Sequence, residues 1–261
     1  MKIATIGDNC VDAYKSIGME YFGGNCVNVA VQAVRQGMQT AYVGALGDDE
    51  TGKRFLEVLK KEGIDTSHIR ILSGKTAVTQ VELINGDRQF GDYDPGVTAI
   101  FKPTEDDINF LADHDIVSSA LWGMVETDLV RIKRKGAPVV FDFCDKLDHE
   151  VIDRIIADVD YAFFSYDGED LEFIKDYMKK IQSRGPKQVI TTRGDKGSIA
   201  WDGTEFYNQG IVPCTVVDTM GAGDSYIAAY ICGIVRGKSI AECMRLGAET
   251  SSRVIQYKGA W

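Results

Sequence analysis

The chain has 261 residues, of which 44% are hydrophobic and 26% charged, a globular composition that excludes a disordered or collagen-like chain. Its 29 basic and 39 acidic residues give a net charge of −10, which repels polyanions, so we expect no nucleic-acid and no membrane partner. The six cysteines lack metal-ligand spacing, and no apolar stretch reaches the roughly 20 residues of a membrane span. We therefore expect a cytoplasmic protein with reduced thiols.

Short apolar runs alternate with helical patterns along most of the chain. Strands are expected at residues 2–6, 40–46, 115–120, 138–143, 161–165 and 188–192. Helices are expected at residues 28–36, 51–62, 104–111, 128–135, 150–156 and 171–183, the third opened by a capping box of Thr104 and Asp107. Because such alternation produces right-handed crossovers, it predicts an α/β fold with a doubly wound, mostly parallel sheet flanked by helices.

Two stretches interrupt this alternation. Residues 10–21 have no helical period, and residues 76–92 contain two strand-like runs on either side of Asn85-Gly86. Asn-Gly is a strong hairpin signal because both residues can adopt a positive φ. We expect these two segments to form a small β lid inserted in a single domain that spans residues 1–261. The exposed strand edges of such a lid also allow a homodimer through it.

The segment 212–235 combines an apolar run, a glycine-rich turn and a helical pattern. We expect a strand through Val217, a turn over residues 218–224 and a helix from Ser225. Such a turn gathers backbone N–H groups and the positive end of a helix dipole, which suits phosphate oxygens. Asp224 lies beside this anion site and could accept a hydroxyl proton. The alternative is that the glycines form only a tight turn and that Asp224 only favours the start of a helix.

Two signature motifs carry a family resemblance. Residues 218–224 resemble the D-T-x-G-A-G-D string of the ribokinase-like (PfkB) carbohydrate kinases, and residues 23–30 are similar to their G-G-x-x-x-N-x-A motif. Weaker matches follow along the chain at Gly7-Asp8 with Val11-Asp12, Gly47-Asp48-Asp49 with Gly52, Gly86-Asp87-Arg88, Asp142 with Lys146, and Thr192-Arg193-Gly194 with Gly197. The chain is thereby identified as a member of this family, which implies a ribokinase-like fold.

This resemblance implies phosphoryl transfer from ATP, with Mg²⁺, to a sugar hydroxyl, and it leaves a monovalent cation open as a further cofactor. In the family's pattern Asp224 is the general base, and the amides of Gly221, Ala222 and Gly223 bind the transferring phosphate. By the same resemblance, Asp12, Gly24 and Asn28 would hold sugar hydroxyls. Lys146, Thr192, Gly194 and Gly197 would line the nucleotide site.

The chain departs from the family at two places. The N-x-x-E element that organises Mg²⁺ should follow residues 161–165, but the chain there lacks the asparagine. Glu169 could bind Mg²⁺ through water, with Asp167 or Asp170 as substitutes, or the run could be simply an acidic start of a helix. Further, Cys144 and Lys146 stand where the family has Asn and Arg, so a point charge replaces a bidentate fork.

Within the family the resemblance is greatest to kinases of glycated lysine, on residues 7–12, 90–93, 141–146 and 255–261. It implies phosphorylation at the C6 hydroxyl of fructoselysine, a ketose joined through C1 to the lysine ε-nitrogen. The protonated amine of this substrate would favour a nearby carboxylate, and Asp92 and Asp94 at the lid end are the candidates, with Asp92 preferred. The alternatives are a fructokinase or ribokinase acting on a free sugar, and a non-catalytic sugar-binding protein.

Overall fold

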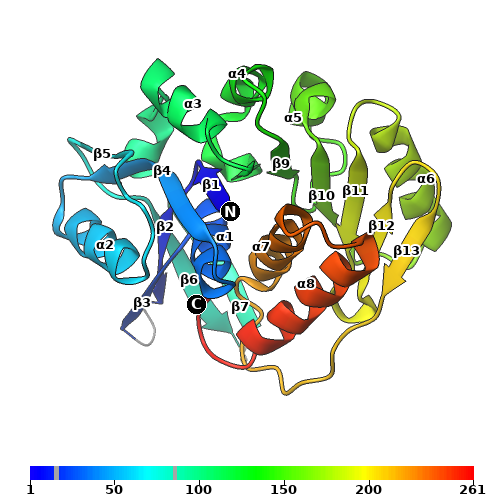
Figure 1. Ribbon diagram of the computed structural model, residues 1–261. Coiled ribbons are helices and arrows are strands. Elements are labelled where there is room, and N and C mark those ends of the chain that lie inside the picture. The colour runs from blue at the N-terminus through cyan, green and yellow to red at the C-terminus, as the bar shows by residue number, and fades with distance from the viewer. Residues whose placement is uncertain (15–17, 85–86) are drawn as a thin grey trace.

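The strands and helices of the protein were located in a computed structural model, which describes residues 1–14, 18–84 and 87–261 (Figure 1). The strands are β1 (Lys2–Ile6), β2 (Cys10–Tyr14), β3 (Met19–Gly23), β4 (Gln39–Gly47), β5 (Ile69–Leu72), β6 (Val78–Ile84), β7 (Asp87–Asp94), β8 (Ile116–Ala120), β9 (Val139–Asp142), β10 (Tyr161–Ser165), β11 (Gln188–Thr192), β12 (Ser198–Trp201) and β13 (Phe206–Gln209). The helices are α1 (Asn25–Arg35), α2 (Glu50–Lys61), α3 (Glu105–Ala112), α4 (Leu129–Arg134), α5 (Glu150–Ile155), α6 (Leu171–Gln182), α7 (Ala222–Val235) and α8 (Ile240–Val254).

The larger sheet confirms the predicted α/β architecture. Among the described residues it has the order β13-β12-β11-β10-β9-β8-β1-β4-β5. All neighbouring strands in the part of this order that runs from β11 to β5 are parallel. Strands β12 and β13 extend the sheet beyond β11 in antiparallel pairs. Helices α3 to α6 cover one face of this sheet, and α1, α2, α7 and α8 cover the other (Figure 1).

The central strand β1 shows why its sequence is almost continuously apolar. Ala4 and Ile6 pack in the core beneath α3 to α6, whereas Ile3 packs against α1 and α7 on the opposite face. Successive side chains of a strand point to opposite faces, so a strand with helices on both sides needs apolar residues at consecutive positions. The bounds expected for β1, β10 and β11 are those observed.

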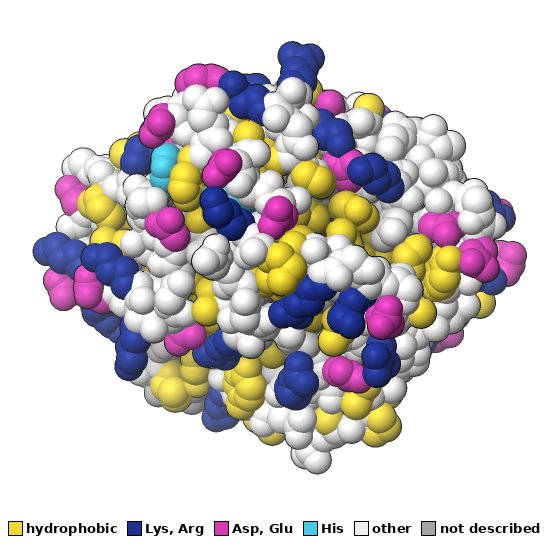
Figure 2. Space-filling view, in the orientation of Figure 1, with side chains coloured by type: hydrophobic (Ala, Val, Ile, Leu, Met, Phe, Trp, Pro, Cys, Tyr) yellow, Lys and Arg dark blue, Asp and Glu magenta, His cyan; other side chains and the backbone are white. Residues whose placement is uncertain are grey.

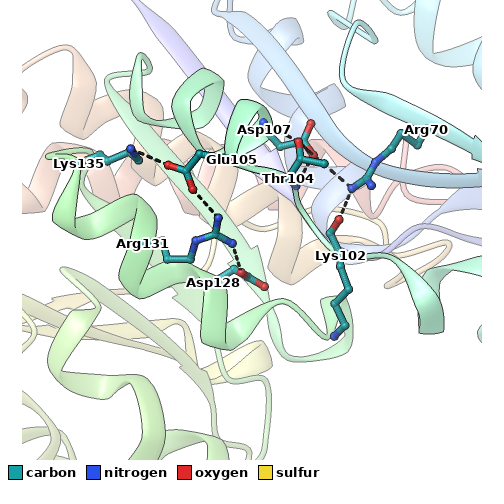
Figure 3. A network of polar contacts seen from close by, with 8 residues as sticks. All are labelled: Arg70, Lys102, Thr104, Glu105, Asp107, Asp128, Arg131 and Lys135. Carbon is teal, nitrogen blue, oxygen red and sulfur yellow. Dashed lines mark hydrogen bonds and ion pairs between the residues drawn. The ribbon is translucent and has the colours of Figure 1, made fainter.

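The capping box expected at the start of α3 is also confirmed. The Asp107 amide donates to Thr104 Oγ1 at 3.2 Å, and the Thr104 amide donates to Asp107 Oδ2 at 2.7 Å. Figure 3 shows how charged side chains extend this cap, with Arg70 of β5 at 3.2 Å from Asp107 and Arg131 of α4 at 2.7 Å from Glu105. These contacts join the start of α3 to β5 and α4.

A second sheet contains the two stretches that interrupt the alternation. Its strand order in the described chain is β3-β2-β6-β7. β2 pairs antiparallel with β3 and parallel with β6, and β6 pairs antiparallel with β7, so segments far apart in sequence lie side by side (Figure 1). The predicted turn at Asn85-Gly86 lies outside the described residues.

The prediction of a strand at residues 212–217 is wrong. This run is irregular, and Ile211, Val216 and Val217 are 52%, 57% and 54% exposed. It borders a cavity instead of joining the sheet, and Pro213 lacks the N–H group that a central strand would need.

The strands β12 and β13 and the helix α8 were not expected from the sequence, although Ser239 and Glu242 form a capping box at the start of α8.

The surface carries neighbouring charges of both signs. Figure 2 shows Lys and Arg side chains beside Asp and Glu side chains, with hydrophobic side chains between them. Pairs such as Arg35 with Glu62 at 3.1 Å and Lys238 with Glu242 at 3.6 Å contribute to this pattern. Within the described residues, no helix combines the length and apolar character needed to cross a membrane.

Candidate active site

Polar residues gather at the carboxyl ends of the parallel strands. Asp8 follows β1, and Asp142, Ser165 and Thr192 end β9, β10 and β11. The chain passes from β1 to β4 on one side and later enters β8 on the other side, so the strand order reverses direction beside β1. In doubly wound sheets, ligands bind in the crevice at this point, outside the carboxyl ends of the strands.

A cavity of about 480 Å³ lies between these strand ends and the second sheet. Its wall carries hydrogen-bonding groups of several kinds and two aromatic side chains. The residues that matter for the chemistry below are Asp8, Asp12, Gly24, Asn28, Tyr93, Trp122, Asp145 and Asp224. Convergent acceptors in a cavity of this size suit a small molecule with several hydroxyl groups. We refer to it as the acceptor cavity.

Asp224 lies in the first turn of α7 at the inner end of the acceptor cavity and is 8% exposed. Burial raises the pKa of Asp224 to about 8; a hydrogen bond from Asn28 Nδ2 at 2.7 Å opposes this shift, while the neighbouring carboxylates add to it. These carboxylates are Asp142, Asp8 and Asp12. A carboxyl group whose pKa lies near physiological pH is suited to taking up a proton from a hydroxyl group.

Asp8 and Gly24 also line the acceptor cavity. The Asp8 carboxylate accepts hydrogen bonds from the amides of Asn25 at 2.6 Å and Cys26 at 3.4 Å, and it therefore caps the positive end of α1. Gly24 has a φ of +101°, and a Cβ there would lie 2.6 Å from the Cα of Asn9. Only glycine fits this approach. Asp8 was not among the predicted site residues, although its place directly after a buried strand was the signal that could have indicated it.

A second cavity, of about 630 Å³, lies on the other side of the α7 start. Thr192, Gly194 and Gly197, three of the four residues expected at the nucleotide site, line it together. Gly197 has a φ of +83°, and a Cβ there would lie 2.1 Å from the Gln209 carbonyl oxygen. The irregular run at 212–216 supplies apolar side chains to the same wall, which suits a flat, partly apolar group such as a nucleotide base. We refer to it as the nucleotide cavity.

The glycine turn separates the two cavities. Met220 and Asp224 line the acceptor cavity, while Ala222 and Gly223 line the nucleotide cavity. Gly221 has a φ of +71° and precedes α7, and nothing occupies the space where a Gly223 side chain would point.

The amides of this turn are not equivalent. The first turn of a helix leaves its N–H groups without acceptors inside the helix, so the Gly223 amide can face an anion. The Ala222 amide differs from the expectation because it donates to the Thr219 carbonyl at 3.2 Å. The Ala222 amide therefore already has an acceptor and is not free to donate to an anion at this turn.

Two predicted residues lie away from the walls of both cavities. The Glu169 side chain is 89% exposed and pairs with Lys196 at 2.7 Å, which lowers the pKa of Glu169. Lys146 pairs with Asp145 at 2.9 Å. Among described residues the nucleotide cavity is lined by Asp167 but by neither Glu169 nor Lys146, and no group of three His, Cys, Asp or Glu side chains there could hold a metal ion.

Asp92 lies on β7 between Gly91 and Tyr93, which both line the acceptor cavity. Asp92 itself does not line this cavity in the described structure, and it is exposed. The carboxylate that lines the outer part of the cavity is Asp145, beside the 44% exposed Trp122. Neither residue was indicated by the sequence, because Trp122 lies in a short 3-10 helix after β8 and Asp145 lies in an irregular segment after β9.

An anion-binding turn between a cavity for a polar molecule and a larger, more apolar one is the arrangement expected of a small-molecule kinase. A model of the pfkB family carbohydrate kinases matches residues 11–261, so this chain belongs to that family. It is 44% identical over 259 residues to the fructoselysine 6-kinase of Escherichia coli (strain K12), covering 99% of both chains. It is also 35% identical over 269 residues to a fructosamine kinase of Bacillus subtilis (strain 168), covering 100% of this chain and 93% of the relative.

Solved structures show the same fold. The ribokinase from Giardia lamblia superimposes with a TM-score of 0.87 at 20% identity, covering 99% of this chain and 94% of that one. An Arabidopsis thaliana ribokinase complexed with ribose and ATP gives a TM-score of 0.85 at 24% identity, with 99% and 93% covered. The ribokinase-like fold expected from the sequence is thus confirmed.

Proposed function

We propose that this protein is an ATP-dependent fructoselysine 6-kinase, which transfers the γ-phosphoryl group of ATP to the C6 hydroxyl of fructoselysine. The observation that carries the chemistry is the buried Asp224 carboxyl beside the glycine turn that separates the two cavities. The similarity to fructoselysine 6-kinases over nearly the whole chain supports the substrate. A protein that only binds sugar would not need a second cavity on the other side of the anion-binding turn.

In the proposed reaction, the C6 hydroxyl lies beside Asp224 and the triphosphate lies in the nucleotide cavity. As the hydroxyl oxygen bonds to the γ-phosphorus, its proton passes to the Asp224 carboxylate. The bond from the γ-phosphorus to the bridging oxygen breaks, and ADP leaves with the electron pair. Negative charge spread over the transferring group is stabilised by the Gly221 and Gly223 amides and by the dipole of α7.

Magnesium would enter with ATP. Mg²⁺ bound to nucleotides keeps several waters and takes most other ligands from phosphate oxygens, so a protein site with a single carboxylate is sufficient. Asp167 supplies such a carboxylate on the wall of the nucleotide cavity. We therefore propose that Asp167, rather than Glu169, would hold the hydrated Mg²⁺ ion. When bound, the ion would neutralise negative charge on the phosphates.

The shape of the acceptor cavity supports an orientation for fructoselysine. With C6 at Asp224, the hydroxyls in the middle of the sugar are near Asp12 and Asn28, and C1 points outward. The lysine methylene groups would then lie on Trp122, and the cationic amines would be near Asp145. This replaces Asp92 as the proposed partner of the amine.

A direct test is an ATPase-coupled assay with fructoselysine, fructose, ribose and other glycated amines as acceptors. We expect fructoselysine to be preferred, and ³¹P and ¹³C NMR of the product should show phosphate on C6. Preference for a free sugar would instead support a fructokinase or ribokinase. Sugar binding without ADP formation would support a non-catalytic binding protein.

The pKa of Asp224 predicts the pH dependence of this activity. The base acts in its ionised form, so kcat/KM should rise through about pH 8 and fall about tenfold per unit well below it. The free energy of unfolding should instead fall as the pH rises toward about 8. The folded-state pKa of Asp224 lies above the ordinary Asp value of 3.8, so ionisation of this group opposes folding. Rate measurements from about pH 6 to 9 at constant ionic strength check this, and a flat profile would contradict it.

We also propose that the sheet β3-β2-β6-β7 is a lid within a single domain of residues 1–261. It carries Asp12, Thr79 and Tyr93 on the wall of the acceptor cavity, so a bound sugar would contact it directly. Amide hydrogen exchange in β2 and β6 should slow when fructoselysine binds, while exchange in β10 and β11 stays unchanged. Equal exchange with and without sugar would count against a closing lid.

Two further features go with this proposal. The outer strands β3 and β7 leave edges at which a second copy could pair, so we propose a homodimer through the lid. The six cysteines are free thiols, which supports a reducing compartment such as the cytoplasm. Light scattering of the intact protein measures the first of these directly.

A further inference from the structure

The segment 259–261 contacts both the glycine turn and helix α1. The Gly259 amide donates to Asp218 Oδ2 at 3.0 Å, and Gln32 Nε2 of α1 donates to the Ala260 carbonyl at 3.1 Å. A Cβ on Gly221 would lie 2.6 Å from Ala260 Cβ, so the glycine turn packs directly on this segment. Trp261 is therefore held at the active site by contacts of the two residues before it.

The indole of Trp261 completes a chain of two hydrogen bonds to the proposed base. Trp261 Nε1 donates to Asn28 Oδ1 at 2.9 Å, and Asn28 Nδ2 donates to Asp224 Oδ2 at 2.7 Å. Both Asn28 and Asp224 are buried. The indole N–H group is a donor and never an acceptor, so it requires the oxygen end of the Asn28 amide to face Trp261. The N–H₂ end must then face Asp224.

We propose that Trp261 is a positioning residue, which fixes the orientation of the Asn28 amide so that it donates to Asp224 and holds that carboxylate toward the acceptor hydroxyl. An Asn amide without this restraint can turn by half a rotation and present its oxygen to Asp224. The turned amide would accept from a protonated Asp224 and repel an ionised one. Trp261 would thus keep Asp224 in the state that can take up a proton.

The charges around Asp224 make this orientation important. The groups that face it are Asp8 after β1, Asp12 of β2, Asp142 of β9 and the Cys144 thiol, and none of these is a cation. The amide of Asn28 is therefore the main neutral donor that favours the ionised carboxylate. The inference rests on the proposed function only for its effect on catalysis, since the hydrogen-bond chain itself can be tested without turnover.

The test compares Trp261→Phe with Trp201→Phe. Both changes replace indole by phenyl, but Trp201 Nε1 has no hydrogen-bond partner in the described part of the structure. The Trp201 ring packs at a tilt against Phe206, with centroids 4.4 Å apart. The Asp224 carboxyl is followed by ¹³C NMR through a pH titration in both variants. We expect Trp261→Phe alone to raise its titration midpoint by about one pH unit, since a hydrogen bond to the charged form is weakened.

Kinetics give the second measurement. For Trp261→Phe, kcat near pH 7 should fall about tenfold and recover toward the wild-type value near pH 9, with KM for ATP unchanged. A loss of similar size at every pH, or an unchanged NMR midpoint, would overturn the positioning role. If the NMR midpoint moves but the pH dependence of kcat does not follow it, Trp261 still positions the Asn28 amide. In that case Asp224 is not the base, and the proposed catalytic role of Asp224 is wrong.

Discussion

Replacing Asp224 by Asn should lower kcat by about 10²–10⁴-fold or more while leaving ATP binding nearly unchanged. The amide has almost the same shape as the carboxyl group and can still occupy the buried site beside Asn28. It cannot accept the proton of the C6 hydroxyl. The loss should therefore appear in kcat rather than in KM for ATP, because the nucleotide cavity is lined by Ala222 and Gly223 but not by Asp224 in the described structure.

Folding of this variant provides an internal control. Burial disfavours the ionised form of Asp224, so the uncharged amide should make the protein equally stable or more stable above about pH 8. Urea unfolding at about pH 6 and pH 9 measures this. The residual activity should also lose the pH dependence expected of the wild type. Turnover close to that of the wild type would remove Asp224 from the mechanism.

Much of the fold could be predicted because the sheet is parallel and covered on both faces. Buried strands such as β10 and β11 are short runs rich in apolar and β-branched residues that stand out from the amphipathic helices between them. The same criterion was misleading at residues 212–217, where the apolar side chains border the nucleotide cavity. A run of apolar residues indicates contact with an apolar environment, and that environment can be a ligand site as well as a core.

The site was predictable where a motif is local in sequence. The glycine turn and Asp224 form one continuous string, and Asn28 lies in another. The absence of Asp92 from the wall of the acceptor cavity was not predictable, because the β6–β7 pairing shifts register between Thr79 and Val81, and such an irregularity changes which side chains face the cavity. The contact of Trp261 with Asn28 joins residues 233 positions apart, and no local pattern indicates it.

Fructoselysine should be a better substrate than fructose by about 10- to 100-fold in kcat/KM. Two parts of the outer cavity contribute to this difference. Each lysine methylene group buried on Trp122 contributes about 0.8 kcal/mol, so two of them account for roughly tenfold. The Asp145 side chain is 68% exposed, and a solvent-exposed ion pair with an amine contributes only about 0.2–1 kcal/mol, or up to roughly fivefold.

These magnitudes assign most of the discrimination to the apolar contact rather than to charge. Trp122→Ala should therefore reduce the fructoselysine-to-fructose ratio of kcat/KM by about tenfold. Asp145→Asn should reduce it by about two- to fivefold at low salt and less at high salt, because exposed charges are screened. Asp92→Asn is the matched control, since that carboxylate is also exposed but does not line the cavity. A larger effect for Asp92→Asn than for Asp145→Asn would make Asp92 the partner of the amine. Equal rates with fructose and fructoselysine would make the protein a free-sugar kinase that still uses Asp224.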